Sequence, residues 1–181
     1  MNIFEIFETK SKNSLFVWLQ ILGWYRQCDV TSYTSDTDFA THSRYLNGKY
    51  LDDKLKDKIS KYQMKMVRRF GEPKNNLEYT TRYGSEMVDL FFVYNNNTHN
   101  LVSVHSPPNY RYLIYPLYEL CSVIFMNQKV LAPCTPEDVI IAEYGKDWQK
   151  PVKSWNYWTA SLNLGPIIKF NTSMGEQKIS Y

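Results

Sequence analysis

The stretch LEYTTRYGSEMVDLFFVY (77–94) decides the fold class, because its apolar residues recur with a period of two. It is rich in Tyr, Thr, Val and Phe, so we predict strands over Leu77–Tyr83 and Met87–Tyr94. The run NNNTHN (95–100) is typical of a turn, and Leu101–His105 is predicted to return as a further strand. A β-sheet is therefore expected at the centre of the fold.

The chain beyond this stretch is divided by further turn signals. Ser106–Asn109 contains two prolines and marks a loop. The residues that follow predict a hairpin with arms Tyr112–Met126 and Lys129–Leu131, joined around Asn127-Gln128. This part of the chain is expected to extend the sheet.

A helix is predicted after the hairpin. TPED (135–138) has a capping hydroxyl, a proline at the first helical position and acids in the first turn. Gly145 is placed to end this helix. From Pro151 onward the chain is aromatic and irregular, so we expect one mixed α/β domain without a dividing linker.

A second helix is predicted upstream of the strands. Asp52 and Asp53 would lie in its first turn, and Arg68 and Arg69 in its last, as the helix dipole favours. Gly71 would then stop it. The apolar stripe that indicates this helix consists of Leu51, Leu55, Ile59, Tyr62, Met66 and Phe70.

The start of the chain is less regular. Residues 1–14 are polar and unpatterned, so we expect a loosely ordered segment there. LFVWLQILGWY (15–25) is apolar and fits a buried helix or a buried strand equally well. Asp29–Ser35 is predicted to be a loop that leads into a short strand, Asp36–Ala40.

The composition is that of an ordinary globular domain. The 181 residues are 44% hydrophobic and 22% charged, which suits one domain with a core of its own. The net charge of +3 is too small to make nucleic-acid binding the default function. No run reaches the roughly 18 consecutive apolar residues that a membrane helix needs, and the start does not resemble a secretory leader. We therefore expect a soluble chain without a membrane span.

Three acids form the most informative cluster. Asp36 and Asp38 stand two apart on a predicted strand, so both side chains project to one face. Asp89 interrupts the apolar run VDLFFVY, where a charge is costly unless it is paired or bound to a metal. Together the three predict a site for a hard cation such as Mg²⁺. The alternative is that Asp36 and Asp38 are ordinary turn residues.

Basic residues near these acids have two interpretations. Arg26, upstream of the acids, could grip a phosphate through its planar guanidinium, or it could form an ordinary surface ion pair. Between Lys54 and Lys74, eight basic residues accompany two acids. A solvated helix face is the first interpretation of that stretch, and a surface for an anionic partner, including nucleic acid, is the second.

Four segments of the chain, in this order, closely resemble the C-terminal catalytic region of the LicD and fukutin family of phosphosugar transferases. They are LGWYRQC (22–28), DTD (36–38), VDLFFVY (88–94) and VLAPCTPEDVIIAEYGKDWQKPVKSW (130–155). The resemblance covers roughly residues 15–158, which we assign to the domain. Residues 1–14 would then precede it, and 159–181 would form an irregular C-terminal tail.

The resemblance implies a nucleotidyltransferase-like fold, a mixed sheet flanked by helices. It also implies metal-dependent transfer of an alditol- or sugar-phosphate, of the ribitol 5-phosphate type, from a CDP-activated donor to an O-mannosyl glycan of a glycoprotein. It implies a Golgi setting and other Golgi glycosyltransferases as partners. The alternative is a truncated, catalytically inactive relative that serves as a binding or scaffold partner.

The family motifs also assign roles by position. Asp36 and Asp38 match the metal-binding acids, and Arg26 matches the arginine of a G-x-x-R element. Mg²⁺ or Mn²⁺ on these acids would neutralise the donor diphosphate, with Arg26 on the same oxygens. Asp38 and Asp89 are the expected catalytic residues. Asp89 would complete the metal shell or accept the proton of the acceptor hydroxyl.

The family's YG-x-x-W-x-x-P block is matched by YGKDW (144–148) and Pro151. The resemblance gives Gly145, Trp148, Pro151 and Trp155 a structural role. It makes Lys146 or Lys153 a candidate for contact with donor phosphate. Two cysteines, Cys121 and Cys134, also have counterparts in the family. They could form a disulfide in an oxidising lumen or remain as buried free thiols.

Overall fold

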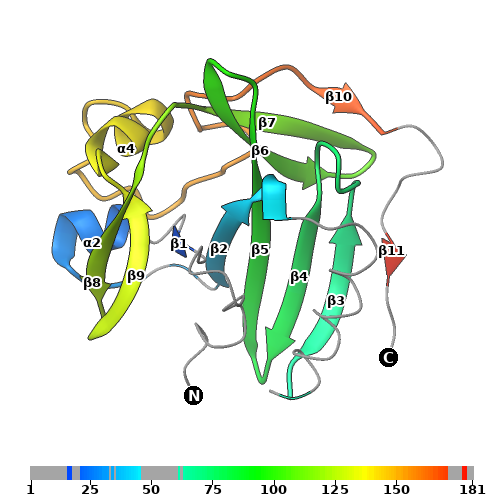
Figure 1. Cartoon of the computed structure of the whole chain (residues 1–181), viewed down its shortest axis with the longest axis horizontal. Helices are drawn as coiled ribbons and strands as arrows, with labels where there is room; N and C mark the ends of the chain where they lie inside the picture. The colour runs from blue at the N-terminus through cyan, green and yellow to red at the C-terminus, as the bar shows by residue number, and fades with distance from the viewer. Residues whose placement is uncertain are drawn as a thin grey trace.

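The computed structural model describes residues 16–17, 21–32, 34, 36–45, 61, 63–170 and 177–178 (Figure 1). The helices in these ranges are α2 (Ile21–Gln27), the 3-10 helix η1 (Ser43–Tyr45) and α4 (Pro136–Tyr144). The strands are β1 (Phe16–Val17), β2 (Asp36–His42), β3 (Lys65–Phe70), β4 (Glu78–Tyr83), β5 (Glu86–Asn95), β6 (His99–Ser106), β7 (Asn109–Pro116), β8 (Leu120–Phe125), β9 (Gln128–Pro133), β10 (Ile168–Lys169) and β11 (Gln177–Lys178).

All the described strands belong to one mixed sheet. Its main order is β10-β7-β6-β5-β2-β1-β9-β8, and it branches at β5, which also pairs with β4, followed by β3 and β11. The β2–β5 and β1–β9 pairs are parallel, and the other pairs are antiparallel. The predicted mixed α/β single domain is therefore confirmed.

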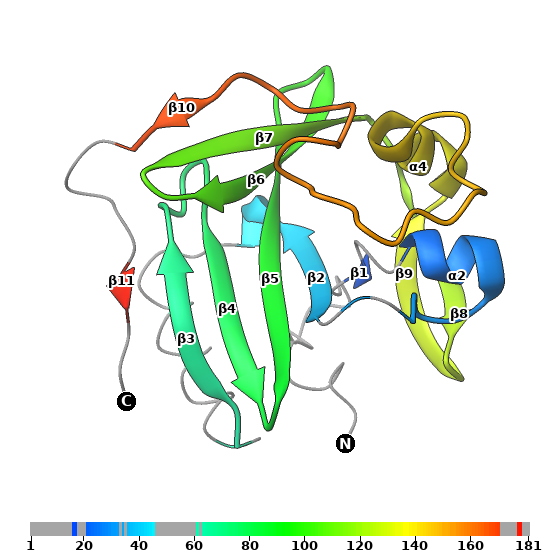
Figure 2. The same cartoon turned by 180° about the vertical axis from the view of Figure 1, so that it is seen from behind.

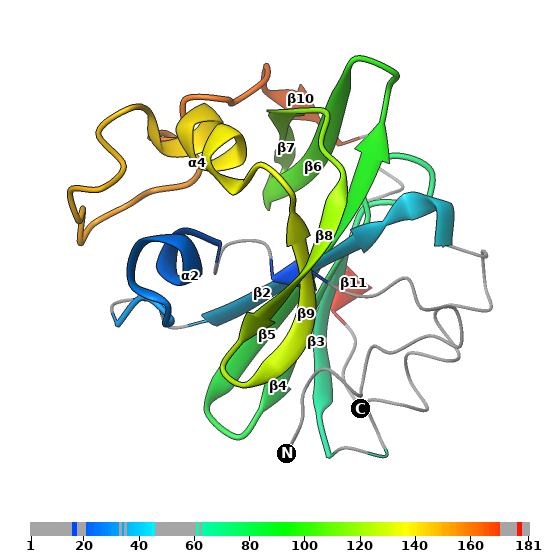
Figure 3. The same ribbon diagram turned by 60° about the vertical axis from the view of Figure 1, so that its left-hand side comes forward.

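Helices α2 and α4 and the segment between α4 and β10 lie on one face of the sheet (Figures 2 and 3). On that face, Phe91 and Val93 of β5 pack in one core with residues of both helices. Their neighbours Leu90 and Phe92 pack in a second core on the other face. The apolar run of β5 is thus continuous because this strand is buried on both sides.

The strands predicted from the period of two are confirmed as β4, β5 and β6. The predicted hairpin is present as β8 and β9, with its turn at Met126-Asn127, but its first arm is shorter than predicted. Residues 112–116 belong instead to β7, which pairs with β6 and β10. The helix predicted at TPED is confirmed as α4, and Gly145 ends it. Thr135 is its N-cap residue but makes no side-chain capping hydrogen bond.

The predicted helix over Leu51–Phe70 is wrong in its last part, where the structure has strand β3. The step from Met66 to Phe70 is four residues, an even number that fits one face of a strand as well as a helical stripe. A β-bulge between Met66 and Arg68 then turns Met66 and Phe70 to opposite faces. The earlier residues of this prediction, 51–60, lie outside the described residues, as does the predicted loose segment 1–14.

The ambiguous stretch 15–25 contains both kinds of element, since β1 pairs with β2 and is followed by helix α2. Residues after 158 also contact the sheet. Strand β10 pairs with β7, and β11 pairs with β3. Within the described ranges, no helix combines the length and the apolar character needed to cross a membrane.

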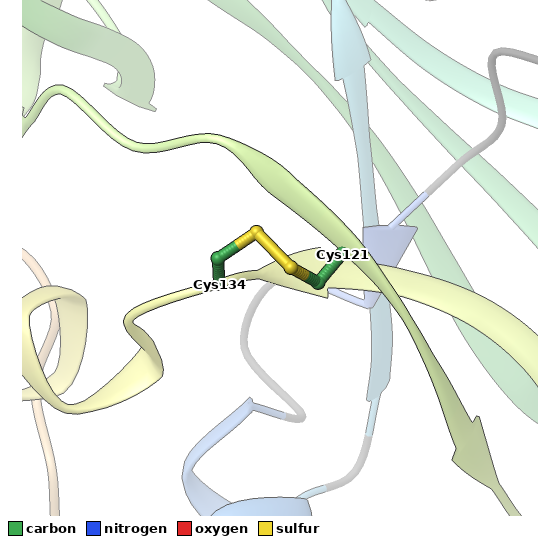
Figure 4. The surroundings of a disulfide bond; sticks show 2 residues. All are labelled: Cys121 and Cys134. Atoms are coloured by element: carbon green, nitrogen blue, oxygen red, sulfur yellow. A yellow bond between two sulfur atoms is a disulfide. The ribbon is translucent and has the colours of Figure 1, made fainter.

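Cys121 and Cys134 form a disulfide (Figure 4). Cys121 lies on β8, and Cys134 follows the end of β9, so the bond joins the two ends of the hairpin. The sequence left open whether these two cysteines are bonded to each other or free, and in the structure they are bonded. The disulfide fixes the point from which the chain enters α4.

Candidate functional site

Asp36, Asp38 and Asp89 meet because β2 and β5 run parallel and in register. Asp38 and Asp89 are direct Cα partners in this pair. Asp36 lies two residues earlier on β2 and therefore on the same face. One carboxylate oxygen of each residue lies within 4.8 Å of the other two. The structure thus brings the three acids singled out in the sequence together.

Burial and mutual repulsion disfavour ionisation of this cluster. Asp38 is 3% exposed, and burial, followed by the charges of Asp36 and Asp89, raises its pKa well above the usual range. Burial raises the pKa of Asp89 to about 6, with a further contribution from Glu78. A cation among the carboxylates would favour their charged forms and offset this repulsion.

Two further observations fit a hard divalent cation. Asp89 Oδ1 is buried and has no hydrogen-bond partner of normal geometry among the described residues. Within the same residues, no Lys or Arg forms a salt bridge with the three acids. Mg²⁺ and Mn²⁺ prefer carboxylate oxygens and keep positions for water and substrate phosphates. The cluster fits such an ion in ligand type, number and spacing.

The acids adjoin a cleft of about 450 Å³. Asp36 and Asp38 line it, together with residues of α2, of the loop before β2, of the end of α4 and of the segment 147–157. Asp89 does not line the cleft, although its carboxylate belongs to the cluster. A ligand in the cleft would therefore meet the two β2 acids directly.

Helix α2 brings Arg26 to this cleft. The Arg26 Nη1 group donates a hydrogen bond to the carbonyl oxygen of Trp148 at 3.5 Å. Gly23 allows the helix to approach the loop before β2, since a Cβ there would lie 2.5 Å from the Asp29 carbonyl oxygen and 3.0 Å from Thr31 N. The LG pair of the sequence motif thus serves close backbone packing.

Of the two lysines singled out in the sequence, Lys153 lines the cleft and Lys146 does not. Lys146 is exposed and does not line the cleft, whereas Lys150 and Lys153 do. Lys150 Nζ lies 3.0 Å from Asp147 Oδ1 in an exposed salt bridge, a kind of pair that contributes little stability. Lys150 and Lys153, rather than Lys146, are therefore the lysines positioned near a ligand of the cleft.

The turn after α4 shapes the neighbouring wall. Gly145 has φ 80°, and its N–H donates to the Ile141 carbonyl oxygen at 2.9 Å. Trp148 is buried among the residues of the helix-side core, with its ring centroid 5.5 Å from that of Tyr25. Pro151 follows on the surface. The contacts of Gly145 and Trp148 are structural ones.

Glu143 is a cleft residue that the sequence analysis did not single out. It is 3% exposed and lines the cleft, and Tyr115 Oη donates a 2.5 Å hydrogen bond to its Oε2. Burial raises the pKa of Glu143 to about 7, although the hydroxyl groups of Tyr115, Tyr144 and Ser161 lower it. The available sequence signal was an acid inside the apolar helix run VIIAEY (139–144).

A buried Glu–His pair lies beside the acids and was also missed. His105 Nδ1 and Glu78 Oε2 are 2.5 Å apart, and both side chains are buried. The His105 ring stacks on Phe70 and Phe170, with centroid distances of 5.1 and 5.5 Å. The charge of Glu78 contributes to the raised pKa of Asp89. The pair therefore belongs to the electrostatic surroundings of the cluster.

The comparisons with known proteins show relatives over most of the chain. The chain is 30% identical over 169 residues to "Ribitol-5-phosphate transferase FKTN" of Homo sapiens and of Macaca fascicularis, a match that covers 88% of the chain. It is also 28% identical over 174 residues to the uncharacterised protein W02B3.4 of Caenorhabditis elegans, again over 88% of its length. No protein-family model matches the chain, and no solved structure gives a significant match.

The similarity is extensive for this chain but partial for its relatives. The chain spans 35% of the length of the human and macaque proteins and 43% of the worm protein. The matched region accounts for most of the chain, as the sequence motifs predicted. The chain therefore belongs to a fukutin-like family.

Proposed function

We propose that this chain is a metal-dependent phosphotransferase of the LicD and fukutin type with a nucleotidyltransferase-like fold. It moves an alditol- or sugar-phosphate from a CDP-activated donor to a glycan of a glycoprotein. The observation that carries the proposal is the in-register convergence of Asp36, Asp38 and Asp89 beside an open cleft. The printed name of the human relative, a ribitol-5-phosphate transferase, suggests ribitol 5-phosphate as the transferred group.

In this transfer, an acceptor hydroxyl oxygen forms a bond to the phosphorus that carries the alditol. The bond from that phosphorus to the oxygen of CMP breaks, CMP leaves with the electron pair, and the hydroxyl proton is lost. Mg²⁺ or Mn²⁺ held by the three acids would supply charge neutralisation at the diphosphate. Asp36 and Asp38 would hold the ion from the cleft side, and Asp89 would hold it from the sheet.

The basic residues of the cleft would bind the donor, and the acids would bind the metal ion. Arg26, Lys150 and Lys153 all line the cleft and would attract the donor diphosphate. The position of Asp89 outside the cleft lining supports the role of metal ligand over that of proton acceptor. Asp38 would be the catalytic carboxylate that contacts both the metal ion and the donor.

The cellular setting is part of the proposal. Disulfides persist in oxidising compartments, so the Cys121–Cys134 bond supports a lumenal environment such as that of the Golgi. An O-mannosyl glycan as the acceptor and other Golgi glycosyltransferases as partners follow from the family resemblance. They belong to the same proposal.

The test is release of CMP from CDP-ribitol by the purified chain, in the presence of an O-mannosyl glycopeptide. We expect release with Mg²⁺ or Mn²⁺ and none with EDTA. Asp38→Asn should abolish release while the fold remains intact by circular dichroism. Glu86→Gln is the matched control, because Glu86 is an exposed acid three residues before Asp89 on the same strand.

Two outcomes would contradict the proposal. Undiminished release by Asp38→Asn would remove the acid cluster from the mechanism. No release by the unmodified chain from CDP-ribitol or related CDP donors, with either metal, would favour the non-catalytic relative that binds a partner transferase or glycan.

A further inference from the structure

One wall of the cleft has no role in the proposed binding of the metal ion and the donor diphosphate. Trp155 and Tyr144 form this wall, with ring centroids 4.8 Å apart. Glu143, adjacent to Tyr144 at the end of α4, lines the cleft beside them. The metal-side acids of the lining come from β2, whereas Tyr144 and Trp155 come from the end of α4 and from the segment that follows it.

Two polar atoms of this wall are buried without a partner. Glu143 Oε1 and Trp155 Nε1 have no hydrogen-bond partner of normal geometry among the described residues, although the hydroxyl groups of Tyr144 and Ser161 are close enough to Glu143 to lower its pKa. The other carboxylate oxygen of Glu143 is occupied, because Tyr115 Oη donates to it. An unpaired buried polar group costs about 1–3 kcal/mol, and native structures contain few of them. Two on residues of one cleft therefore indicate a ligand that completes them.

The chemistry of the two atoms indicates the kind of ligand. Trp155 Nε1–H can only donate a hydrogen bond, and Glu143 Oε1, when the carboxyl group is ionised, can only accept one. A hydroxyl group does both, so a carbon chain or ring with several hydroxyls can satisfy both atoms. The adjacent flat faces of Trp155 and Tyr144 suit the C–H surface of such a molecule, since aromatic rings provide large apolar contact areas.

We propose that Glu143 and Trp155 form a hydroxyl-binding wall that binds the polyol part of the substrate. The inference rests on the proposed function, and it adds the residues that select the substrate. The polyhydroxyl group could belong to the alditol of the donor or to the acceptor glycan, and both present the same chemistry. In either case the wall contacts hydroxyls while the charged part of the cleft holds the diphosphate.

The experiment distinguishes binding of the polyol from binding of the nucleotide. Binding of CDP-ribitol and of CDP is measured by titration calorimetry with Mg²⁺ for the unmodified chain and for three variants. Trp155→Phe keeps an aromatic ring and removes the donor, and Glu143→Met fills the space and removes the acceptor. Glu137→Gln is the matched control, because Glu137 is an exposed acid of the same helix that does not line the cleft. The KM for an O-mannosyl glycopeptide is measured on the same proteins.

If the wall binds the alditol of the donor, Trp155→Phe and Glu143→Met weaken CDP-ribitol binding at least tenfold and leave CDP binding unchanged. If it binds the acceptor, both affinities remain and the KM for the glycopeptide rises at least tenfold. In both cases Glu137→Gln stays within about threefold of the unmodified chain. A merely structural role of Glu143 and Trp155 would instead weaken the binding of CDP, CDP-ribitol and the glycopeptide alike.

The inference is overturned if these variants weaken CDP and CDP-ribitol equally, or if they change neither the affinities nor the KM. It is also overturned if Glu137→Gln behaves like Glu143→Met. Failure of the proposed function is a different result, in which the unmodified chain binds neither CDP nor CDP-ribitol.

Discussion

Asp38 and Asp89 are direct partners across the parallel strands β2 and β5, and their carboxylates point to the same face of the sheet. Like charges opposite each other on neighbouring strands destabilise a sheet. In this chain, burial and then the charges of Asp36 and Asp89 raise the pKa of Asp38 well above its usual range. The arrangement is unfavourable for an apoprotein and favourable for a protein that binds a cation there.

The first prediction concerns the stability of the metal-free chain. Burial raises the pKa of Asp89 to about 6, so its ionisation above that pH destabilises the fold. Asp89→Asn should therefore raise the free energy of unfolding by ~1–3 kcal/mol at pH 8 in EDTA. Urea denaturation followed by circular dichroism measures this. The same variant should lose the rise in Tm that Mg²⁺ gives the unmodified chain.

Glu86→Gln controls for a general effect of removing an acid from β5, since Glu86 is exposed. It should change neither the stability in EDTA nor the response to Mg²⁺. The metal assignment would be contradicted by an Asp89→Asn protein that is less stable in EDTA, or by one that still responds fully to Mg²⁺.

The second prediction concerns pH. Burial raises the pKa of Glu143 to about 7 from its ordinary value of 4.5, so between these values the folded chain holds a proton that the unfolded chain releases. The stability that this proton provides is complete below pH 4.5 and is lost as the pH rises through 7. The metal-free chain should therefore lose about 2–3 kcal/mol from this group between pH 5 and 8.

Glu143→Gln isolates this contribution, because the amide does not titrate in that range. Urea denaturation at pH 5 and pH 8 should show a smaller loss for the variant than for the unmodified chain. Equal losses in the two proteins would contradict the burial of an ionisable Glu143. Glu143→Gln also removes a charge that helps to raise the pKa of Asp38, which further reduces the loss expected for the variant.

The third prediction concerns the turn that ends α4. Gly145 has φ 80° and ψ −178°, a region that only glycine adopts readily. A Cβ at this position would also lie 2.9 Å from Leu162 Cδ1. Gly145→Asn should therefore lower the free energy of unfolding by ~1–3 kcal/mol, measured by urea denaturation. It should also weaken binding in the cleft, because residues 147–157 follow this turn.

Gly84 provides the matched control. It has φ 59° and open space around it, and asparagine tolerates the left-handed helical region. Gly84→Asn should change stability by less than about 1 kcal/mol. If both variants behave alike, the special backbone of Gly145 is not what fixes the cleft wall.

Local patterns in the sequence predicted much of the fold. The period of two gave β4, β5 and β6, and capping residues gave α4. The same reasoning was wrong for β3, because the even spacing of Met66 and Phe70 suits both periods and a bulge has no sequence pattern of its own. The branching of the sheet at β5 depends on pairings between distant segments, which local periodicity does not contain.

The candidate site was predicted in part, for a related reason. Asp36, Asp38 and Asp89 were visible because acids within apolar strands require an explanation. Glu143 was missed, and Trp155 was given only a structural role, because the unpartnered atoms of these residues can be recognised only in the structure. Lys146 and Lys153 were chosen from the sequence, and the turn after Gly145 places Lys153, together with Lys150, along the cleft.

The most direct test of the account is the position of a bound ion. Crystals of the chain grown with Mn²⁺ and CDP should give an anomalous difference peak at the manganese absorption edge. The account predicts one peak within about 2.5 Å of carboxylate oxygens of Asp36, Asp38 and Asp89. Nucleotide density in the cleft with no peak at these acids, or a peak at a different set of ligands, would contradict it.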